Sequence, residues 1–122
     1  MAAENTNDLP SISLEENLKK AMTELLILHL LSHRQYYIGE LTSTLSEKSN
    51  KVLNIVFPYS AIYRMLQAKH IFECEKRIAP DGRRRQYFQI TDQGRAYYER
   101  LVKIYRDFTY GIDTVLSDET LG

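Results

Sequence analysis

Residues 71–95 read IFECEKRIAPDGRRRQYFQITDQGR, and this stretch decides the fold. Apolar and charged side chains alternate over residues 71–78, which predicts a half-buried strand. Residues 79–82, Ala-Pro-Asp-Gly, have turn chemistry because Pro fixes one backbone angle and Gly tolerates a positive one. Residues 86–90 return as a second strand, so the segment is a β-hairpin. The apolar face of the first strand is predicted to consist of Phe72, Cys74 and Ile78.

A long helical pattern begins well before this hairpin. Ser13 with Glu16 three positions later forms a capping box, and leucines then recur at helical spacing, so we predict a helix over residues 13–32. Its second half is apolar on more than one stripe and needs cover on two sides. Residues 1–12 are polar and lack periodicity, which predicts a disordered tail.

Two shorter helical patterns separate the first helix from the hairpin. One covers residues 38–46, and the other begins with Pro58 in its first turn and runs to residue 69. Between them, the apolar run at residues 52–57 fits either a short strand or a buried loop. Three helices followed by a hairpin predict a winged helix-turn-helix domain over residues 13–91.

After the hairpin, residues 92–116 predict one long helix whose apolar residues step by three and four, the spacing of a heptad seam. At ~1.5 Å per residue, such a helix is about 37 Å long, more than a small domain covers. The alternative, a stripe packed on the same chain, accounts for only the first two seam residues. We therefore predict a dimerisation helix, followed by a tail at residues 117–122. The predicted dimer seam is Tyr98, Leu101, Tyr105, Phe108, Ile112 and Val115.

The 122-residue chain has a formal net charge of zero, but its charges are segregated. Residues 61–106 hold eleven basic and five acidic groups, a surplus of six positive charges, whereas residues 1–60 are at minus two and residues 107–122 at minus four. Because a polyanion responds to the local field, zero net charge does not exclude nucleic acid.

The hairpin turn gathers five cations. Like charges at close range repel, so a partner that neutralises them is the economical explanation, and arginine forks fit phosphate oxygens. The alternative is a solvated hairpin tip. With the hairpin placed after three helices, we favour DNA binding through Lys76, Arg77, Arg83, Arg84 and Arg85.

The third helix is expected to enter the major groove of double-stranded DNA. Tyr63 has a second interpretation, because it fits equally well under the helix. A different class of function, a winged-helix protein-interaction module that does not bind DNA, also fits the element order. The candidate DNA contacts on this helix are Tyr59, Ser60, Tyr63 and Arg64.

Aromatic side chains on the last helix, together with one methionine on the first, could line an effector pocket for a flat aromatic ligand. The alternative is that they form only dimer core. The candidate pocket residues are Met22, Tyr97, Tyr98, Tyr105 and Phe108.

Nothing in the sequence indicates catalysis, a cofactor, a metal site or a membrane span. The single Cys74 fits a small core residue in a strand, and His29, inside the apolar first helix, fits a core histidine. We therefore expect a cytoplasmic protein that is not an enzyme.

The wing sequence also resembles a known family. Residues 81–95 resemble the wing of PadR-family transcriptional regulators, which reads Gly, basic residues, two aromatics, an aliphatic, Thr and then Gly. The resemblance extends to residues 37–41 and 62–72, and the single long C-terminal helix resembles the short subtype. It implies a dimeric winged-helix repressor, in a family whose members often respond to small aromatic or drug-like compounds. A dimer that places two third helices in successive major grooves predicts an inverted-repeat operator. Pro58-Tyr59-Ser60 stands where the family has Thr-Leu-Tyr.

Overall fold

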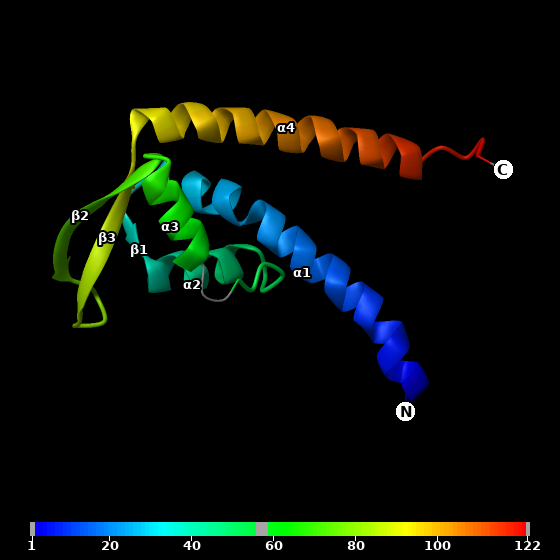
Figure 1. Cartoon of the computed structure of the whole chain (residues 1–122), viewed down its shortest axis with the longest axis horizontal. Helices are drawn as coiled ribbons and strands as arrows, with labels where there is room; N and C mark the ends of the chain where they lie inside the picture. Colours follow the sequence, from blue (N-terminus) through cyan, green and yellow to red (C-terminus); the bar gives the residue numbers. More distant parts are fainter. Residues whose placement is uncertain (1, 56–58, 122) are drawn as a thin grey trace.

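The computed structural model describes residues 2–55 and 59–121 and is mainly helical, with a small antiparallel sheet at one end (Figure 1). The predicted fold class, helices with a β-hairpin and a long C-terminal helix, is confirmed. The elements in chain order are α1 (Ala2–Leu31), β1 (Tyr36–Tyr37), α2 (Ile38–Lys48), α3 (Tyr59–Gln67), β2 (Ile71–Ile78), β3 (Arg84–Ile90) and α4 (Asp92–Leu116).

The sheet has three strands rather than the two expected. β2 and β3 form the predicted hairpin, and β1 pairs with the other edge of β3, giving the order β1-β3-β2. In that pairing Tyr36 lies opposite Phe88, and Tyr37 lies opposite Tyr87. Sequence reasoning missed β1 because a two-residue strand has no alternation to detect.

The predicted apolar face of β2 is wrong. Phe72 is 43% exposed and Ile78 65% exposed, whereas Ile71, opposite Ile90, is buried. A bulge between Glu73 and Lys76 shifts the register, so the alternation read from the sequence does not persist along the strand. β3 supplies two core side chains, Phe88 and Ile90, whereas β1 and β2 supply one each. Cys74, expected in the core, is only partly buried.

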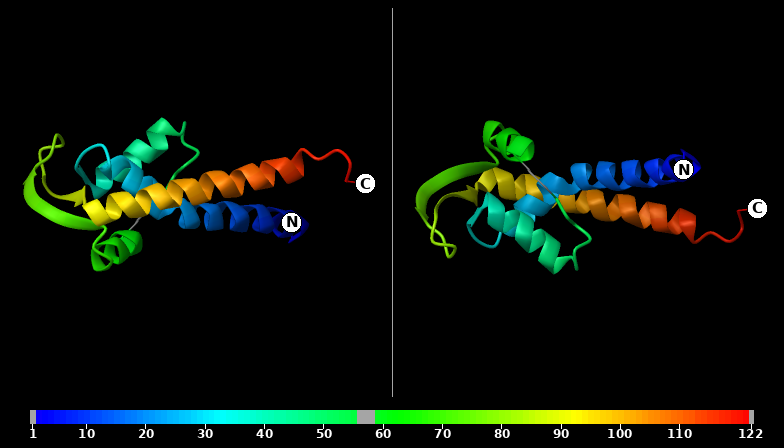
Figure 2. Two further views of the ribbon diagram at one scale, coloured as in Figure 1. Left: turned by 90° about the horizontal axis from the view of Figure 1, so that it is seen from above. Right: turned by 90° about the horizontal axis from the view of Figure 1, so that it is seen from below.

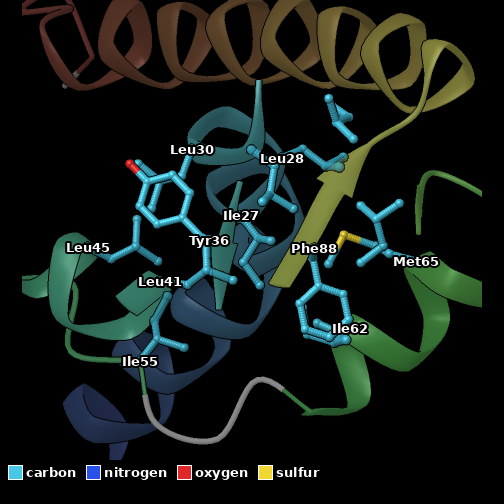
Figure 3. Close-up of a cluster of buried hydrophobic side chains, with 14 residues drawn as sticks. Ile27, Leu28, Leu30, Tyr36, Leu41, Leu45, Ile55, Ile62, Met65 and Phe88 are labelled. Atoms are coloured by element: carbon cyan, nitrogen blue, oxygen red, sulfur yellow. The ribbon is translucent and has the colours of Figure 1, made fainter. Parts of the chain in front are cut away.

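The core lies where the second half of α1 meets α2, α3 and the sheet (Figure 3). Ile27, Leu28 and Leu31 of α1 are almost completely buried. They pack with side chains from α2, α3 and the sheet, including Leu41 of α2 and Met65 of α3. The two-sided cover predicted for this part of α1 is therefore provided by the chain itself.

The structure corrects two expectations about α1. The helix begins at Ala2, so Ser13 and Glu16 lie inside it rather than at a cap, and the tail expected over residues 1–12 is helical from Ala2. His29 is exposed rather than in the core. Its ring is only partly covered, by the start of α4, where its Nδ1 lies 2.6 Å from the Tyr98 hydroxyl.

The two shorter helices are close to their predicted ranges. α2 extends two residues further than predicted, to Lys48, and α3 ends at Gln67 instead of Lys69. Lys69 has a positive φ of 62°, a conformation that ends a helix. Pro58, expected in the first turn of α3, and part of the run at residues 52–57 lie outside the described residues.

α4 has the predicted bounds, and Thr91 caps it by accepting a hydrogen bond from the Gly94 N–H at 2.9 Å. The helix lies along the second half of α1 and then projects beyond the winged domain, diverging from the first half of α1 (Figures 1 and 2). The joint between α4 and the domain is close: a Cβ on Gly94 would lie 2.0 Å from the carbonyl oxygen of His70.

Candidate nucleic-acid interface

One face of α3 is turned outward. Ala61, Ile62 and Met65 anchor the opposite face in the core. The sequence allowed Tyr63 either to face DNA or to pack under the helix. It is 63% exposed and does not pack under the helix. Gln67 shares the outer face, and sequence reasoning missed it because it carries no charge or ring. The predicted contact residues are all exposed: Tyr59, Ser60, Tyr63 and Arg64.

Arg64 is held in place on this outer face. Its Nε donates a hydrogen bond to the Glu24 carboxylate of α1 at 2.9 Å. The ion pair fixes the guanidinium beside the face and neutralises its charge. The face of α3 is therefore mainly aromatic and polar, a surface suited to groove contacts more than to long-range attraction of phosphate.

We call the β2–β3 hairpin, residues 71–90, the wing. Its five cations fall into two groups, those paired within the protein and those that are not. Arg77 stacks on the Tyr87 ring at 3.6 Å and donates from Nη1 to the Gln35 Oε1 at 2.7 Å. Arg85 pairs with the Asp81 carboxylate, with Nε 3.1 Å from Oδ2. Both guanidinium groups are thus engaged within the protein. In the part of the chain that the structure describes, three wing cations make no side-chain hydrogen bond or ion pair: Lys76, Arg83 and Arg84.

Asp81 organises the turn between the two strands. Its carboxylate accepts from the Arg85 side chain and from the Arg83 backbone N–H at 3.0 Å, and these two hydrogen bonds hold the pKa of Asp81 below its usual value. Gly82 has a φ of 82°, which the turn requires. The tip therefore has a defined shape that presents its remaining cations outward.

A groove of about 650 Å³ joins the wing to the helices. β1 and α2 contribute Tyr37 and Thr42, α3 contributes Tyr59, and β3 contributes Arg85, whose guanidinium lies 5.2 Å from the Tyr37 ring. The Tyr37 ring packs on Gly39, where a Cβ would lie 3.1 Å from Cε2. This concave surface was not predicted, because it depends on the pairing of β1 with β3.

The end of α3 is tied to the start of α4. The Thr91 hydroxyl donates to the Lys69 carbonyl at 2.7 Å, and the Thr91 N–H donates to the His70 carbonyl at 3.0 Å. The His70 ring stacks on Tyr97 at 4.2 Å. We call this set of contacts the α3–α4 joint; it makes the orientation of α4 depend on that of α3.

A second groove, of about 710 Å³, lies between α1 and α4 where the two helices diverge. Tyr98 is not part of this groove, because its hydroxyl is turned toward His29. The other four candidate effector residues line it: Met22, Tyr97, Tyr105 and Phe108.

The predicted dimer seam is covered at one end and open at the other. Tyr98 and Leu101 pack against the core of their own chain. Phe108 and Val115 are 69% and 60% exposed. The exposed apolar surface is broader than predicted, since Leu18 on α1 and two further α4 residues add to it: Ile104 and Leu116.

Other kinds of site find no support among the residues that the structure describes. Residues 2–55 and 59–121 contain no group of three side chains placed to hold a metal ion. None of the described helices is both long and apolar enough to cross a membrane.

Residues 27–100 match the model of the transcriptional regulator PadR-like family. This stretch includes α2, α3, the wing, the α3–α4 joint and the first part of α4. A curated protein of Lysinibacillus sphaericus, described as uncharacterized, is 29% identical over 89 residues, which are 72% of this chain and 82% of that protein.

Solved structures share the fold. A PadR-like transcriptional regulator from Bacillus cereus superposes with a TM-score of 0.72 at 24% identity, covering 84% of this chain and 99% of that one. A PadR family transcriptional regulator from Eggerthella lenta gives a TM-score of 0.73 at 18% identity, covering 93% of this chain and 94% of that one. At these identities the likeness concerns the fold.

Proposed function

Because this chain belongs to the PadR-like family of transcriptional regulators, we propose that it is a homodimeric repressor that binds an inverted-repeat operator in double-stranded DNA. The observation that carries this proposal is the combination on one domain of an outward face of α3 with three unpartnered cations on the wing beside it. A role on DNA also places the protein in the cytoplasm.

In the proposed complex, α3 enters the major groove and its outer face contacts base edges and nearby phosphates. Arg83 and Arg84 hold phosphates on the flanking backbone and fix the register without reading sequence. Arg77 and Arg85 act mainly inside the protein, shaping the wing through Tyr87 and Asp81. Non-specific affinity should be modest, since the whole chain is neutral.

The homodimer is supported by the open half of α4. Exposed apolar surface of this extent marks an interaction site. A second copy is the economical occupant, because a two-fold axis sets the exposed α4 faces of both copies against each other and covers them at once. Dimerisation also brings two α3 helices to successive major grooves.

Release of the repressor by a small aromatic ligand is the finer part of the proposal. Aromatic residues line the α1–α4 groove, and a planar ligand can stack there. Because the α3–α4 joint couples the two helices, a ligand that changes the packing of α4 also changes the spacing of the two α3 helices in the dimer.

Footprinting the purified protein on the DNA upstream of its own gene tests the proposal. A protected inverted repeat, with affinity that falls steeply with salt, is the expected result. Weak, salt-insensitive binding without a footprint would instead favour the protein-interaction module, with the wing docking an acidic partner.

The phosphate role of the wing has its own test. Arg84→Ala should weaken binding to the operator and to random DNA about equally. Because the dimer loses one phosphate contact in each protomer, the salt slope should fall by about 2. The matched control is Lys103→Ala, which removes a positive charge from the exposed surface of α4. This variant should change neither the affinity for DNA nor the salt slope. If Arg84→Ala weakened binding to the operator but not to random DNA, Arg84 would be contacting bases rather than phosphates.

For the ligand, the dimer is titrated with a panel of planar aromatic compounds while tyrosine fluorescence is followed. A saturable change that Met22→Ala weakens, at a groove residue of α1 outside the predicted dimer seam, supports the groove as the site. The absence of a saturable change across a broad panel excludes it.

A further inference from the structure

A third groove, of about 550 Å³, lies on the other side of α1, between its end, α2 and the loop that follows α2. Its volume is within the range of small-molecule sites. Leu30, Tyr36 and Leu45, which also belong to the core, lie together in Figure 3 and form part of its floor. The aliphatic side chains of the floor are Leu26, Leu30, Leu45 and Leu53.

Two pairs of polar side chains face this groove from opposite walls. His29 and His33 stand one helical turn apart at the end of α1, with their rings edge to face at 5.0 Å. Thr44 and Lys48 stand one turn apart on α2. All four of these side chains can donate hydrogen bonds, and none of the described residues that line the groove is acidic.

These donors are available. Within residues 2–55 and 59–121, the Thr44 hydroxyl and the Lys48 ammonium have no hydrogen-bond or ion-pair partner, and His29 uses only Nδ1, toward Tyr98. Ser49, also on the wall, is different, because its hydroxyl already bonds the Leu45 carbonyl at 2.7 Å. The hydrogen-bond donors without a partner therefore lie together above the leucine side chains that form the floor of the groove.

We propose that this groove binds a small monocarboxylate with an aliphatic tail. The carboxylate lies between the two pairs and accepts from Lys48, Thr44 and the histidines, while the tail covers the leucines. Charge complementarity selects an anion, and the aliphatic floor selects the tail. This site is distinct from the α1–α4 groove and does not depend on the DNA-binding role.

The site has a direct link to α4. His29 joins the groove to the Tyr98 hydroxyl at 2.6 Å. Burial, and secondly the neighbouring His33, lower the pKa of His29. A bound carboxylate offsets both effects and favours the protonated ring, which donates from both nitrogens. The groups that face His29 are His33, Tyr98 and, across the groove, Lys48.

The three histidines make a direct experiment available, because their ring C–H signals can be followed separately by NMR. On titration with hexanoate, the signals of His29 and His33 should shift and saturate, while that of His70, which stacks on Tyr97 away from the groove, stays unchanged. Hexanamide, the neutral isostere, should produce no saturable shift. Hexanoate affinity should rise as the pH is lowered from 7.5 to 6.

Lys48→Gln should weaken hexanoate binding by about three- to fivefold, the size expected for a partly exposed ion pair. Lys51→Gln, at a neighbouring exposed lysine outside the groove, is the matched control and should bind as the unmodified protein does. Equal binding of hexanamide, equal affinity of the two variants, or no saturable shift of His29 and His33 would each overturn the proposal. Binding in the α1–α4 groove would leave both histidine signals in place and so also counts against it.

Discussion

The two halves of α4 share one apolar spacing but have different surroundings. In the first half, Tyr97, Tyr98 and Leu101 pack against the core of the winged domain. In the second half, Phe108 and Val115 continue the same face but are mostly exposed. Figure 1 shows why: the first half lies over the end of α1, and the second half extends past the domain.

This difference shows that heptad spacing determines which side of a helix is apolar but does not determine which residues cover that side. The first half is covered because the buried end of α1 lies beneath it. The second half has the same hydrophobic driving force and, within the described chain, no cover. Stability of the first half should therefore be intrinsic to the protomer, whereas that of the second half should depend on association.

Two glycines, one in each half, test this contrast most strongly. Gly94→Ala places a Cβ 2.0 Å from the His70 carbonyl oxygen, so either the α3–α4 joint separates or the backbone shifts. We expect the free energy of unfolding to fall by roughly 2–4 kcal/mol. Urea denaturation at a fixed protomer concentration measures it.

The matched control is Gly111→Ala in the second half, where a Cβ meets nothing within 4 Å. There the substitution should raise stability by about 0.5–1 kcal/mol, because alanine has the higher helix propensity. Equal losses at the two positions would contradict the assignment of a covered and an uncovered half.

The next largest effect is expected on the dimer. Phe108→Asp puts a charge in the exposed apolar face, and the dimer dissociation constant should rise roughly 30-fold or more, the cost of losing a central apolar anchor. Analytical ultracentrifugation over a range of concentrations measures it. Tyr110→Asp, on the opposite side of α4 and 75% exposed, should leave the constant unchanged. A dimer that tolerates Phe108→Asp but not Tyr110→Asp would place the interface on the other face.

Periodic patterns made much of this architecture predictable. The bounds of β2 and α4, the turn at Gly82 and the outward face of α3 follow from local spacing and turn chemistry. The wing cations were likewise identifiable, because a run of arginines beside a turn is a local feature.

What the sequence did not predict depends on tertiary pairing. The way β2 pairs with β3 turns Ile71 rather than Phe72 to the core, and the two-residue β1 exists only because β3 lies beside it. Nor could the sequence separate Arg77 from Arg84, since the stacking of Arg77 on Tyr87 needs the folded sheet.

A smaller effect is expected at the cap of the covered half. Thr91→Val removes the hydrogen bonds to the Gly94 N–H and the Lys69 carbonyl and should cost about 1–2 kcal/mol of unfolding free energy. Thr91→Ser retains the hydroxyl and should stay within a few tenths of a kcal/mol. Hydrogen exchange at the Gly94 amide should quicken in the valine variant only. Unchanged exchange would show that packing alone holds the joint.

The smallest effect is a pH dependence in the covered half of α4, where His29 meets Tyr98. The pKa of His29 is below its ordinary 6.5, first because of burial and then because of His33, so folding favours the neutral ring. Its contribution is present above about pH 6.5 and is lost as the pH falls through the lowered value. Thermal unfolding midpoints at pH 7.5 and 5.5 should therefore differ less in His29→Gln than in the unmodified protein. Tyr98→Phe leaves both causes of the shift in place and should keep the difference, even though it removes the hydrogen bond. A flat profile in Tyr98→Phe would show that the hydroxyl, rather than burial and His33, sets the titration of His29.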